Sequence, residues 1–552
     1  MESEEDSSTS SNQTEAIPNK VASKDKWKKG GRMISWLVGS NVLLFSCTLV
    51  TCVFNQNVDV WETDLLIFLS VMLVLCMLWM LFQMFFTWKY KHAILCKDCH
   101  AGPIWMRGGI VIFGIGTLVM DSFKVIHAVG YLGCEPPVKV IQPVLQAIFV
   151  IMQTYFLWMS SKHCVQIYIN ATRCGLMLLM IINLAVWVIA VTEESKHHTV
   201  ELGRYLAQNG TEESENSSHG QQEKLHDCEC TFMCTFVASE YYYLYPFNIE
   251  YNLFSATMIY IMWKNVGRKI DENASHNHGI GPAVRKHVPL LGLISGLSVL
   301  AIGLVMFIMY EIGRNNLLKD WLSLTTFYIF HVVSLVIMSL ANLVGIIIFH
   351  LDKRSMDNQK NHTRTLDMVL LLGTTLAQYA ISYYSIVAMV ATNPPSLLSY
   401  LTLIYSLLMI VQHSLQNVFI IKGLHRLPPN HTINSSDRSQ KMKDLRSVSC
   451  VPQNASHLPV HQLSRRATLT NQLKAHLKKR KTMKDVYMFL FLSNVIFWIM
   501  PAFGARIRFD NDLEVEFYGF TIWAIITNIC LPFGIFYRMH AAASLLELYN
   551  KH

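Results

Sequence analysis

Charged side chains are scarce in this sequence, and that scarcity is its most informative feature. Only 15% of the 552 residues are Asp, Glu, Lys or Arg, whereas 52% are hydrophobic, and the mean hydropathy is +0.30. A soluble globular protein carries about 25% charged residues. So large an apolar fraction excludes an ordinary water-soluble domain and indicates a chain whose solvent is largely the lipid bilayer.

Motifs of several function classes are also missing. The sequence has no nucleotide-binding loop, no nucleophile elbow and no His-Glu-x-x-His zinc motif, which argues against an enzyme. It has no basic stripe with a nucleic-acid motif, so its net charge of +8 does not predict a nucleic-acid partner. Residues 1–31 are rich in Ser, Glu and Lys and lack the apolar region of a signal peptide. We expect them to form a disordered cytoplasmic tail.

Twelve apolar runs are long enough to cross about 30 Å of hydrocarbon, which needs about 20 helical residues. They lie at about 33–54, 61–88, 104–132, 138–159, 168–192, 246–263, 288–310, 322–349, 367–391, 397–422, 483–504 and 517–537. The sequence therefore predicts an all-α polytopic membrane protein with about twelve transmembrane helices.

The segments between the runs alternate in charge. Lys and Arg gather before the first run and after each even-numbered run, including the linkers 264–287 and 423–482 and the C-terminal segment 538–552. The positive-inside rule places such segments in the cytoplasm. We therefore expect a multi-pass protein of the plasma membrane with both termini cytoplasmic.

The longest segment on the opposite side, 193–245, is acidic. It carries two N-glycosylation acceptors, Asn209 and Asn216. Four cysteines fall on the same side and can form disulfides, although their spacing leaves the pairing open: Cys134, Cys228, Cys230 and Cys234.

Polar residues recur at matching places in two halves of the chain, 32–263 and 288–537. The offset between partners changes only where one half has a longer loop than the other, as a duplication requires. Because each half holds an even number of runs, the two should be parallel repeats related by an axis along the membrane normal. The matching pairs, at offsets of 263, 311 and 266 positions, are Gln153 with Gln416, Asn183 with Asn494, and Glu250 with Glu516.

Amide side chains form a narrow stripe along the fourth run. Gln142, Gln146 and Gln153 fall within about 40° of one another at 100° per residue. Such a stripe predicts a hydrated surface enclosed by protein. The alternative is interhelical hydrogen bonding, which contributes about 0.6 kcal/mol per bond. The tenth run repeats the stripe with Tyr405, Gln412 and Gln416.

Ionisable side chains inside a bilayer cost at least about 2.5–3.5 kcal/mol at a helix centre, so they must face protein or water. Asp121 and Lys124 lie one turn apart and can form a structural ion pair instead of serving conduction. A lone membrane histidine is often a hydrogen-bonded structural residue, and a glutamate at a helix end can be solvated. The candidates for a proton relay are Asp121, Lys124, His127, Glu250, Glu311, His331 and Glu516.

Three segments resemble signatures of the otopetrin family. They are Tyr245-Pro-Phe-Asn-Ile-Glu-Tyr-Asn-Leu-Phe, Ser414-Leu-Gln-Asn-Val-Phe-Ile-Ile-Lys-Gly-Leu-His-Arg, and the run from Asn494 to Glu547. The resemblance extends over the whole membrane region and is greatest to the otopetrin-3 branch. It implies a proton-selective channel that carries H⁺ into the cell in response to extracellular acid. It also implies a homodimer with sterol or another lipid in a central cavity, and inhibition by zinc.

The resemblance further implies a Gln–Asn–Tyr constriction on the proton path. In the first half it maps to Gln153, Asn183 and Tyr251. In the second half Gln416 and Asn494 match. Phe517 stands at the third position, opposite Tyr251, and the neighbouring Tyr518 can supply the missing hydroxyl.

The mechanism we expect is a water wire interrupted by amide groups, which donate and accept hydrogen bonds and so order water. Protons can hop through such a wire where a hydrated sodium ion cannot pass. Zinc would compete at outward groups such as His197, His198 and Glu250. A proton-coupled secondary transporter is the alternative, since twelve spans in parallel repeats are also typical of that class. Proton flux without any added substrate separates the two.

Overall fold

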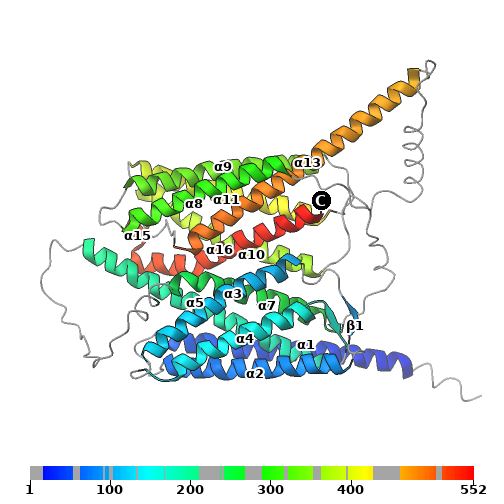
Figure 1. The fold of residues 1–552 in the computed structure, drawn as a ribbon, viewed down its shortest axis with the longest axis vertical. Helices are drawn as coiled ribbons and strands as arrows, with labels where there is room; N and C mark the ends of the chain where they lie inside the picture. Colours follow the sequence, from blue (N-terminus) through cyan, green and yellow to red (C-terminus); the bar gives the residue numbers. More distant parts are fainter. Residues whose placement is uncertain are drawn as a thin grey trace, which may run out of the picture. The chain divides into compact units, whose positions relative to one another are not determined.

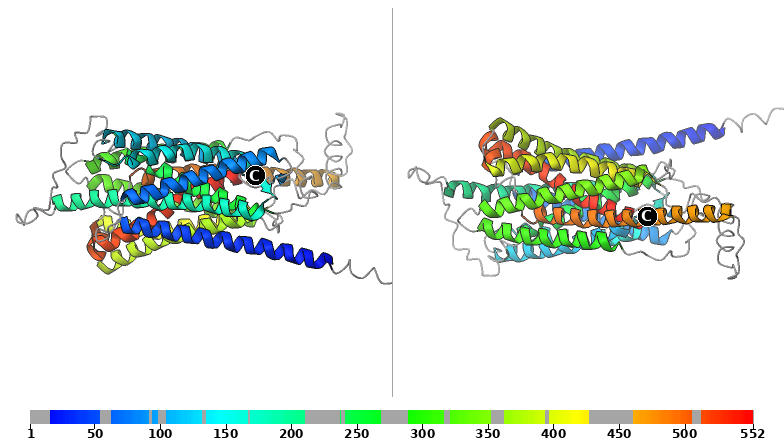
Figure 2. Two further views of the ribbon diagram at one scale, coloured as in Figure 1. Left: turned by 90° about the horizontal axis from the view of Figure 1, so that it is seen from below. Right: turned by 90° about the horizontal axis from the view of Figure 1, so that it is seen from above.

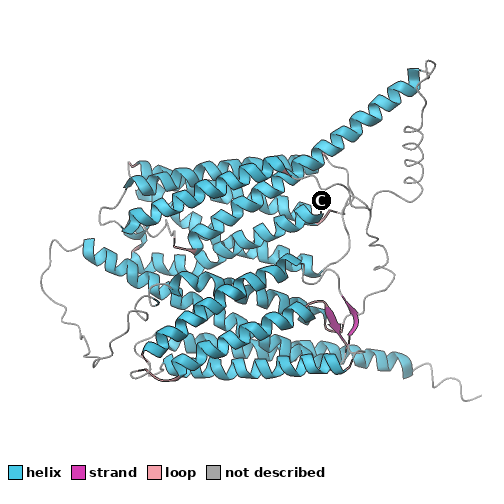
Figure 3. Ribbon diagram, viewed as in Figure 1, coloured by secondary structure: helices cyan, strands magenta, loops and turns pink. Residues whose placement is uncertain are grey.

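A computed structural model describes residues 16–53, 62–90, 94–97, 104–131, 135–166, 168–209, 237, 241–267, 289–315, 321–351, 362–392, 396–426, 460–504 and 512–551. The chain divides into two compact units, 1–279 and 280–552, and their boundary falls inside the predicted linker 264–287. Figure 1 traces the chain through both units, and Figure 3 shows that the described part is almost wholly helical.

Six long helices make up the described part of the first unit. They are α1 (Ala16–Val53), α2 (Glu62–Lys89), α3 (Ile104–Gly130), α4 (Val138–Ser160), α5 (Ile169–Asn209) and α7 (Tyr245–Asn265). A short strand β1 (Ile94–Lys97) pairs antiparallel with β2 (His163–Val165), and the 3-10 turn η2 (Tyr241–Leu244) leads into α7.

The described part of the second unit also contains six long helices, together with one short one. The long helices are α8 (Leu290–Asn315), α9 (Trp321–His350), α10 (His362–Thr392), α11 (Leu397–Leu424), α13 (Val460–Ala502) and α16 (Phe520–Lys551). The short helix α15 (Asp512–Tyr518) precedes α16, and Gly519 between them has a φ of 78°. Glycine adopts this left-handed conformation without steric cost, so the chain can turn there.

The long helices pack in the same pairs within each unit. In the first unit, α5 packs against α1 and α7, α4 packs against α2 and α3, and α3 packs against α7. In the second unit, α13 packs against α8 and α16, α11 packs against α9 and α10, and α10 packs against α16. Figure 2 shows that the helices within a unit run roughly alongside one another.

Eleven helices of the described residues are long and apolar enough to cross a membrane, which confirms an all-α polytopic membrane protein. They coincide with eleven of the twelve predicted runs. The remaining run is α7, a helix of 21 residues whose hydropathy is lowered by Asn248, Glu250 and Asn252. Large apolar side chains such as Leu78, Ile302 and Val390 remain exposed, as expected for helices that face lipid.

Several helices extend further than the apolar runs predict. Helix α1 already begins at Ala16, within the predicted disordered tail, and α5 continues to Asn209, within the predicted outer loop. Helix α13 begins at Val460, within the predicted linker. Hydropathy marks only the part of a helix that lies in hydrocarbon, so it cannot locate ends that project beyond it.

The segment 538–552, predicted to be the cytoplasmic C-terminus, is helical as far as Lys551. Arg538 suggested a polar end to the last run, but it lies inside the helix and is 3% exposed. The residues after it include Ala541, Leu545 and Leu548, which are good helix formers and are buried on one face. Packing of that face therefore stabilises the helix beyond Arg538.

Candidate functional site

Two buried amides face each other inside the first unit. The Nε2 atom of Gln153 on α4 donates to Oδ1 of Asn183 on α5 over 2.8 Å, and Nδ2 of Asn183 donates back to Oε1 of Gln153 over 2.9 Å. Both side chains have 0% exposure. A reciprocal amide pair of this kind uses donors and acceptors on both partners, so it closes the space between the two helices.

Tyr251 on α7 completes this cluster. Gln153 Nε2 also lies 3.3 Å from the Tyr251 hydroxyl, which in turn donates to the backbone oxygen of Val150 over 3.0 Å. The hydroxyl of Thr154 is a further neighbour at 3.1 Å. Three helices thus contribute the Gln–Asn–Tyr cluster that the family resemblance predicts for this half.

The second unit holds the same cluster, but with a different tyrosine from the one expected. Nε2 of Gln416 on α11 donates to Oδ1 of Asn494 on α13 over 3.1 Å, and Asn494 returns the bond over 3.0 Å. The third member is Tyr537 on α16, whose hydroxyl lies 3.3 Å from Gln416 Nε2.

The expectation of Phe517 or Tyr518 at this place is wrong. Both belong to the short helix α15, and the Tyr518 hydroxyl bonds the backbone oxygen of Tyr384 over 3.0 Å. The sequence comparison aligned α7 with the start of the last predicted run. That start belongs to α15, whereas the true counterpart of α7 is α16. An extra helical segment before the last span misleads any alignment that assumes six elements per half.

A sequence signal for the correct tyrosine was present. Pro246-Phe247-x-Ile249-x-Tyr251 matches Pro532-Phe-Gly-Ile-Phe-Tyr537 at an offset of 286 positions, compared with the 266 that joins Glu250 to Glu516. With this offset the partner of Glu250 is Phe536. Glu250 is therefore a carboxyl group of the first half alone, and Glu516 is an exposed residue of α15.

The residue after the tyrosine differs sharply between the units. In the first unit it is Asn252, whose Nδ2 donates to Asn248 Oδ1 over 2.7 Å. In the second it is Arg538, whose guanidinium donates to Oε1 of Gln412 over 3.0 Å and to Oδ1 of Asn494 over 3.2 Å. A buried cation therefore contacts the Gln–Asn pair of the second unit.

The amide stripe of α4 points into the interior of the first unit, as its spacing predicts. Gln142 donates to Gln146 over 2.9 Å, and Gln146 lies 3.5 Å from Asn248 on α7. The three residues are all buried. They form a hydrogen-bonded series on the way from a large cavity toward the Gln153 cluster, which is two turns further along α4.

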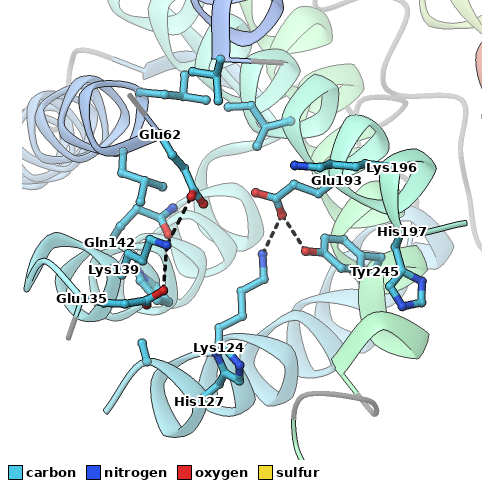
Figure 4. Close-up of a pocket in the computed structure, with 16 residues that line it drawn as sticks. Glu62, Lys124, His127, Glu135, Lys139, Gln142, Glu193, Lys196, His197 and Tyr245 are labelled. Atoms are coloured by element: carbon cyan, nitrogen blue, oxygen red, sulfur yellow. Dashed lines mark hydrogen bonds and ion pairs between the residues drawn. The ribbon is translucent and has the colours of Figure 1, made fainter. Parts of the chain in front are cut away.

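That cavity has a volume of about 550 Å³ and is lined by Gln142 together with many charged side chains (Figure 4). Lys139 bridges Oε2 of Glu62 at 3.2 Å and Oε1 of Glu135 at 3.0 Å. His127, Lys196 and His197 also line it. The positive-inside rule predicts that this end of the unit is the outer one.

Lys124 does not pair with Asp121 as expected. Its ammonium lies 3.1 Å from Oε2 of Glu193 on α5, and the Tyr245 hydroxyl donates to the same oxygen over 2.6 Å. Lys124 faces the cavity, whereas Asp121 is 1% exposed and neither of its carboxyl oxygens has a hydrogen-bond partner among the described residues. The spacing of three residues allowed the local pair, but Glu193 on α5 and the ring of Tyr245 on α7 lie within reach of Lys124 and supply its partners.

Two further candidates are His331 and Glu311, and the His331 ring packs against Phe497 at 5.0 Å between ring centroids. His331 is buried, bonds the backbone oxygen of Phe327 through Nδ1 over 2.9 Å, and packs against Phe327 at 4.4 Å between ring centroids. This is the structural environment weighed above as the alternative. Glu311 is half-buried on α8, next to Gly504.

Several predictions fall outside the described part of the chain. They concern the side chains of His198 and Asn209, together with Asn216 and the four cysteines Cys134, Cys228, Cys230 and Cys234. Among the described residues, no three His, Cys, Asp or Glu side chains are grouped so as to hold a metal ion.

Both units of the chain match known proteins. The family model Otopetrin matches residues 105–227, 205–443 and 457–539. The human protein "Proton channel OTOP2" is 44% identical over 541 residues, which cover 95% of this chain and 96% of that protein. Human "Proton channel OTOP3" is 37% identical, covering 95% and 86%, and mouse "Proton channel OTOP1" is 33% identical, covering 97% and 92%. Identity with OTOP2 exceeds identity with OTOP3, which corrects the expected branch. The chain belongs to the otopetrin family.

Proposed function

We propose that this protein is a proton channel in which H⁺ crosses the membrane through buried polar clusters inside its helical units. The observation that carries the proposal is the Gln–Asn–Tyr cluster, built twice from three helices and wholly buried each time. The similarity to relatives whose names describe proton channels, over nearly the full length of the chain, supports the same function.

In the first unit the path starts at the charged outer cavity. It follows Gln142 and Gln146 toward the amide pair of Gln153 and Asn183. Each amide both donates and accepts, so a proton can be handed on when the pair opens to admit water. A hydrated sodium ion would need a continuous gap, which the reciprocal pair closes.

The second unit is less suited to pass a positive charge. Arg538 lies 3.2 Å from the Asn494 amide oxygen, at the place where a proton would cross. Two unit charges about 4 Å apart repel by about 4 kcal/mol at an effective dielectric constant of about 20. The first unit has neutral Asn252 at the matching position. We therefore propose that the first unit carries most of the current.

The test is proton flux in liposomes that contain the purified protein, reported by an internal pH-sensitive dye after external acidification. We expect flux without added substrate and without sodium leak, and we expect Gln153→Leu to lower it. The matched variant in the other unit, Gln416→Leu, should lower it less. Liposomes that remain impermeable to protons, or that are equally permeable to sodium, would contradict the proposal. A requirement for a co-substrate would favour a transporter.

The finer expectations rest on the family resemblance and remain proposals. They are a homodimer, sterol or other lipid in a central cavity, residence in the plasma membrane with both termini cytoplasmic, and glycosylation at Asn209 and Asn216. Zinc inhibition at His197, His198 or Glu250 belongs with them. His197 lines the outer cavity, where a bound cation would hinder proton entry. Zinc sensitivity that persists in a His197→Ala variant would direct attention to other groups.

A further inference from the structure

A second, much smaller cavity lies at the other end of the first unit. It offers about 10 Å³ to the centre of a water molecule and is lined by side chains of α2, α4, α5 and α7 and by β2. Its polar lining residues are Gln83, Thr87, Ser160, His163 and Thr172.

Two of these side chains make no hydrogen bond within the part of the chain that the structure describes. Gln83 is 7% exposed and Thr172 is 4% exposed, yet neither side chain makes a hydrogen bond to a described residue. Leaving a buried polar group unsatisfied costs about 1–3 kcal/mol, so such groups are nearly always bonded to protein or to an ordered water. A water site needs about 10–15 Å³ of such space and two to four polar partners. The cavity meets both conditions for one water.

The cavity also lies close to the amide pair. Phe156, which lines it, is three residues after Gln153 on α4, a distance of about 4.5 Å along the helix axis. Met262 from α7 and Leu176 from α5 line it as well. These are the three helices that supply the Gln–Asn–Tyr cluster, so the cavity continues the same interhelical space toward the inner end.

The second unit lacks two of these hydroxyl groups. At the offsets of 263 and 311 positions established for α4 and α5, Ser160 and Thr172 correspond to Gly423 and Met483. A Cβ atom on Gly423 would lie 2.8 Å from Leu548 and 3.4 Å from Phe349. In the second unit, apolar Leu548 and Phe349 therefore pack at the position that Ser160 occupies in the first unit.

We propose that the first unit holds one structural water bound by Gln83, Ser160, His163 and Thr172, and that this water is the inner relay of the proton path. It accepts the proton after the Gln153–Asn183 pair and passes it toward the inner end of the unit, beside the β1–β2 sheet. The inference rests on the proposed proton function for the relay role, whereas the water site itself stands on packing and unsatisfied polar groups.

The experiment combines radiolytic hydroxyl-radical footprinting with proton flux on the full-length protein in liposomes. Radicals formed from an ordered water oxidise the side chains around it, so buried Met262 should be labelled far faster than its 5% exposure predicts. Gln83→Leu and Thr172→Val should abolish this labelling and lower the flux by about tenfold, since each removes a hydrogen bond from the relay. Thr172→Ser, which keeps the hydroxyl, should recover most of the flux that Thr172→Val loses.

Met483→Leu is the matched control in the second unit, and its flux should equal that of the parent protein. Slow labelling of Met262 in the parent would overturn the water site. Labelling that disappears in Thr172→Val while flux stays at the parent value would overturn the relay role. Failure of the wider proton path is recognised separately, because Gln153→Leu would then leave the flux unchanged with the Met262 labelling intact.

Discussion

The two units of this protein share one set of helix contacts but differ along their interiors. The first presents a charged cavity of about 550 Å³, an amide series and neutral Asn252 beside its Gln–Asn–Tyr cluster. In the second, Arg538 bonds to the cluster, and apolar Leu548 and Phe349 pack beside Gly423. The duplicated scaffold therefore keeps the same buried cluster while the charge beside it differs between the units.

The largest effect that would sharpen this comparison is expected for Gln153→Leu. Leucine leaves the Asn183 amide without its partner and interrupts the donor–acceptor series. Proton flux should fall at least about tenfold, which corresponds to about 1.4 kcal/mol in the barrier. The measurement is dye-reported flux at equal protein content, with chromatographic profile and helical circular dichroism as folding controls. An equal or larger loss for Gln416→Leu would break the comparison.

Arg538→Asn tests the cation that distinguishes the second unit. It gives α16 the residue that α7 has, removing the positive charge beside Asn494 while keeping an amide. Flux should rise several-fold, and in a Gln153→Leu background it should recover part of what was lost. A double variant as inactive as Gln153→Leu alone would show that charge is not what limits the second unit.

Glu193→Gln tests the charged cavity of the first unit, and we expect a weaker effect on flux. The change removes the negative charge that pairs with the Lys124 ammonium. The electrostatic potential at the cavity then becomes more positive and disfavours proton entry. Because Lys124 and Glu193 are partly exposed, with 23% and 32% of their side chains accessible, solvent screens the effect. We expect about a two- to threefold decrease in flux at low ionic strength that shrinks as salt is added. A salt-independent decrease would indicate a structural cause.

The smallest effect is expected from Glu516→Gln, the residue that sequence alignment had paired with Glu250. Because Glu516 is exposed on α15, the proton flux of the Glu516→Gln variant should equal that of the parent protein within error. Glu250→Gln, by contrast, alters a carboxyl group with 0% exposure on the helix that bears Tyr251 and should lower flux measurably. Similar behaviour of the two variants would restore the original pairing of these glutamates.

Much of the fold followed from the sequence because its signals are local. A run of about 20 apolar residues is visible without knowing its neighbours, and all twelve runs correspond to helices in the structure. The partnership of Gln153 with Asn183, and of Gln416 with Asn494, followed from family motifs and matching offsets. Tyr537 was missed because the short helix α15 shifts the alignment of the last span. A hydropathy search does not detect α15, which has only seven residues.

By itself, the sequence determined that this is a multispanning helical protein of two similar halves and which polar residues its bilayer helices carry. Only the tertiary structure decided which of those residues meet. Lys124 binds Glu193 in place of Asp121, Tyr537 reaches Gln416, and Arg538 contacts Asn494. The reason is physical: composition reports the solvent that a segment prefers, whereas a hydrogen bond between helices depends on how their faces are turned toward each other. That geometry is a property of packing.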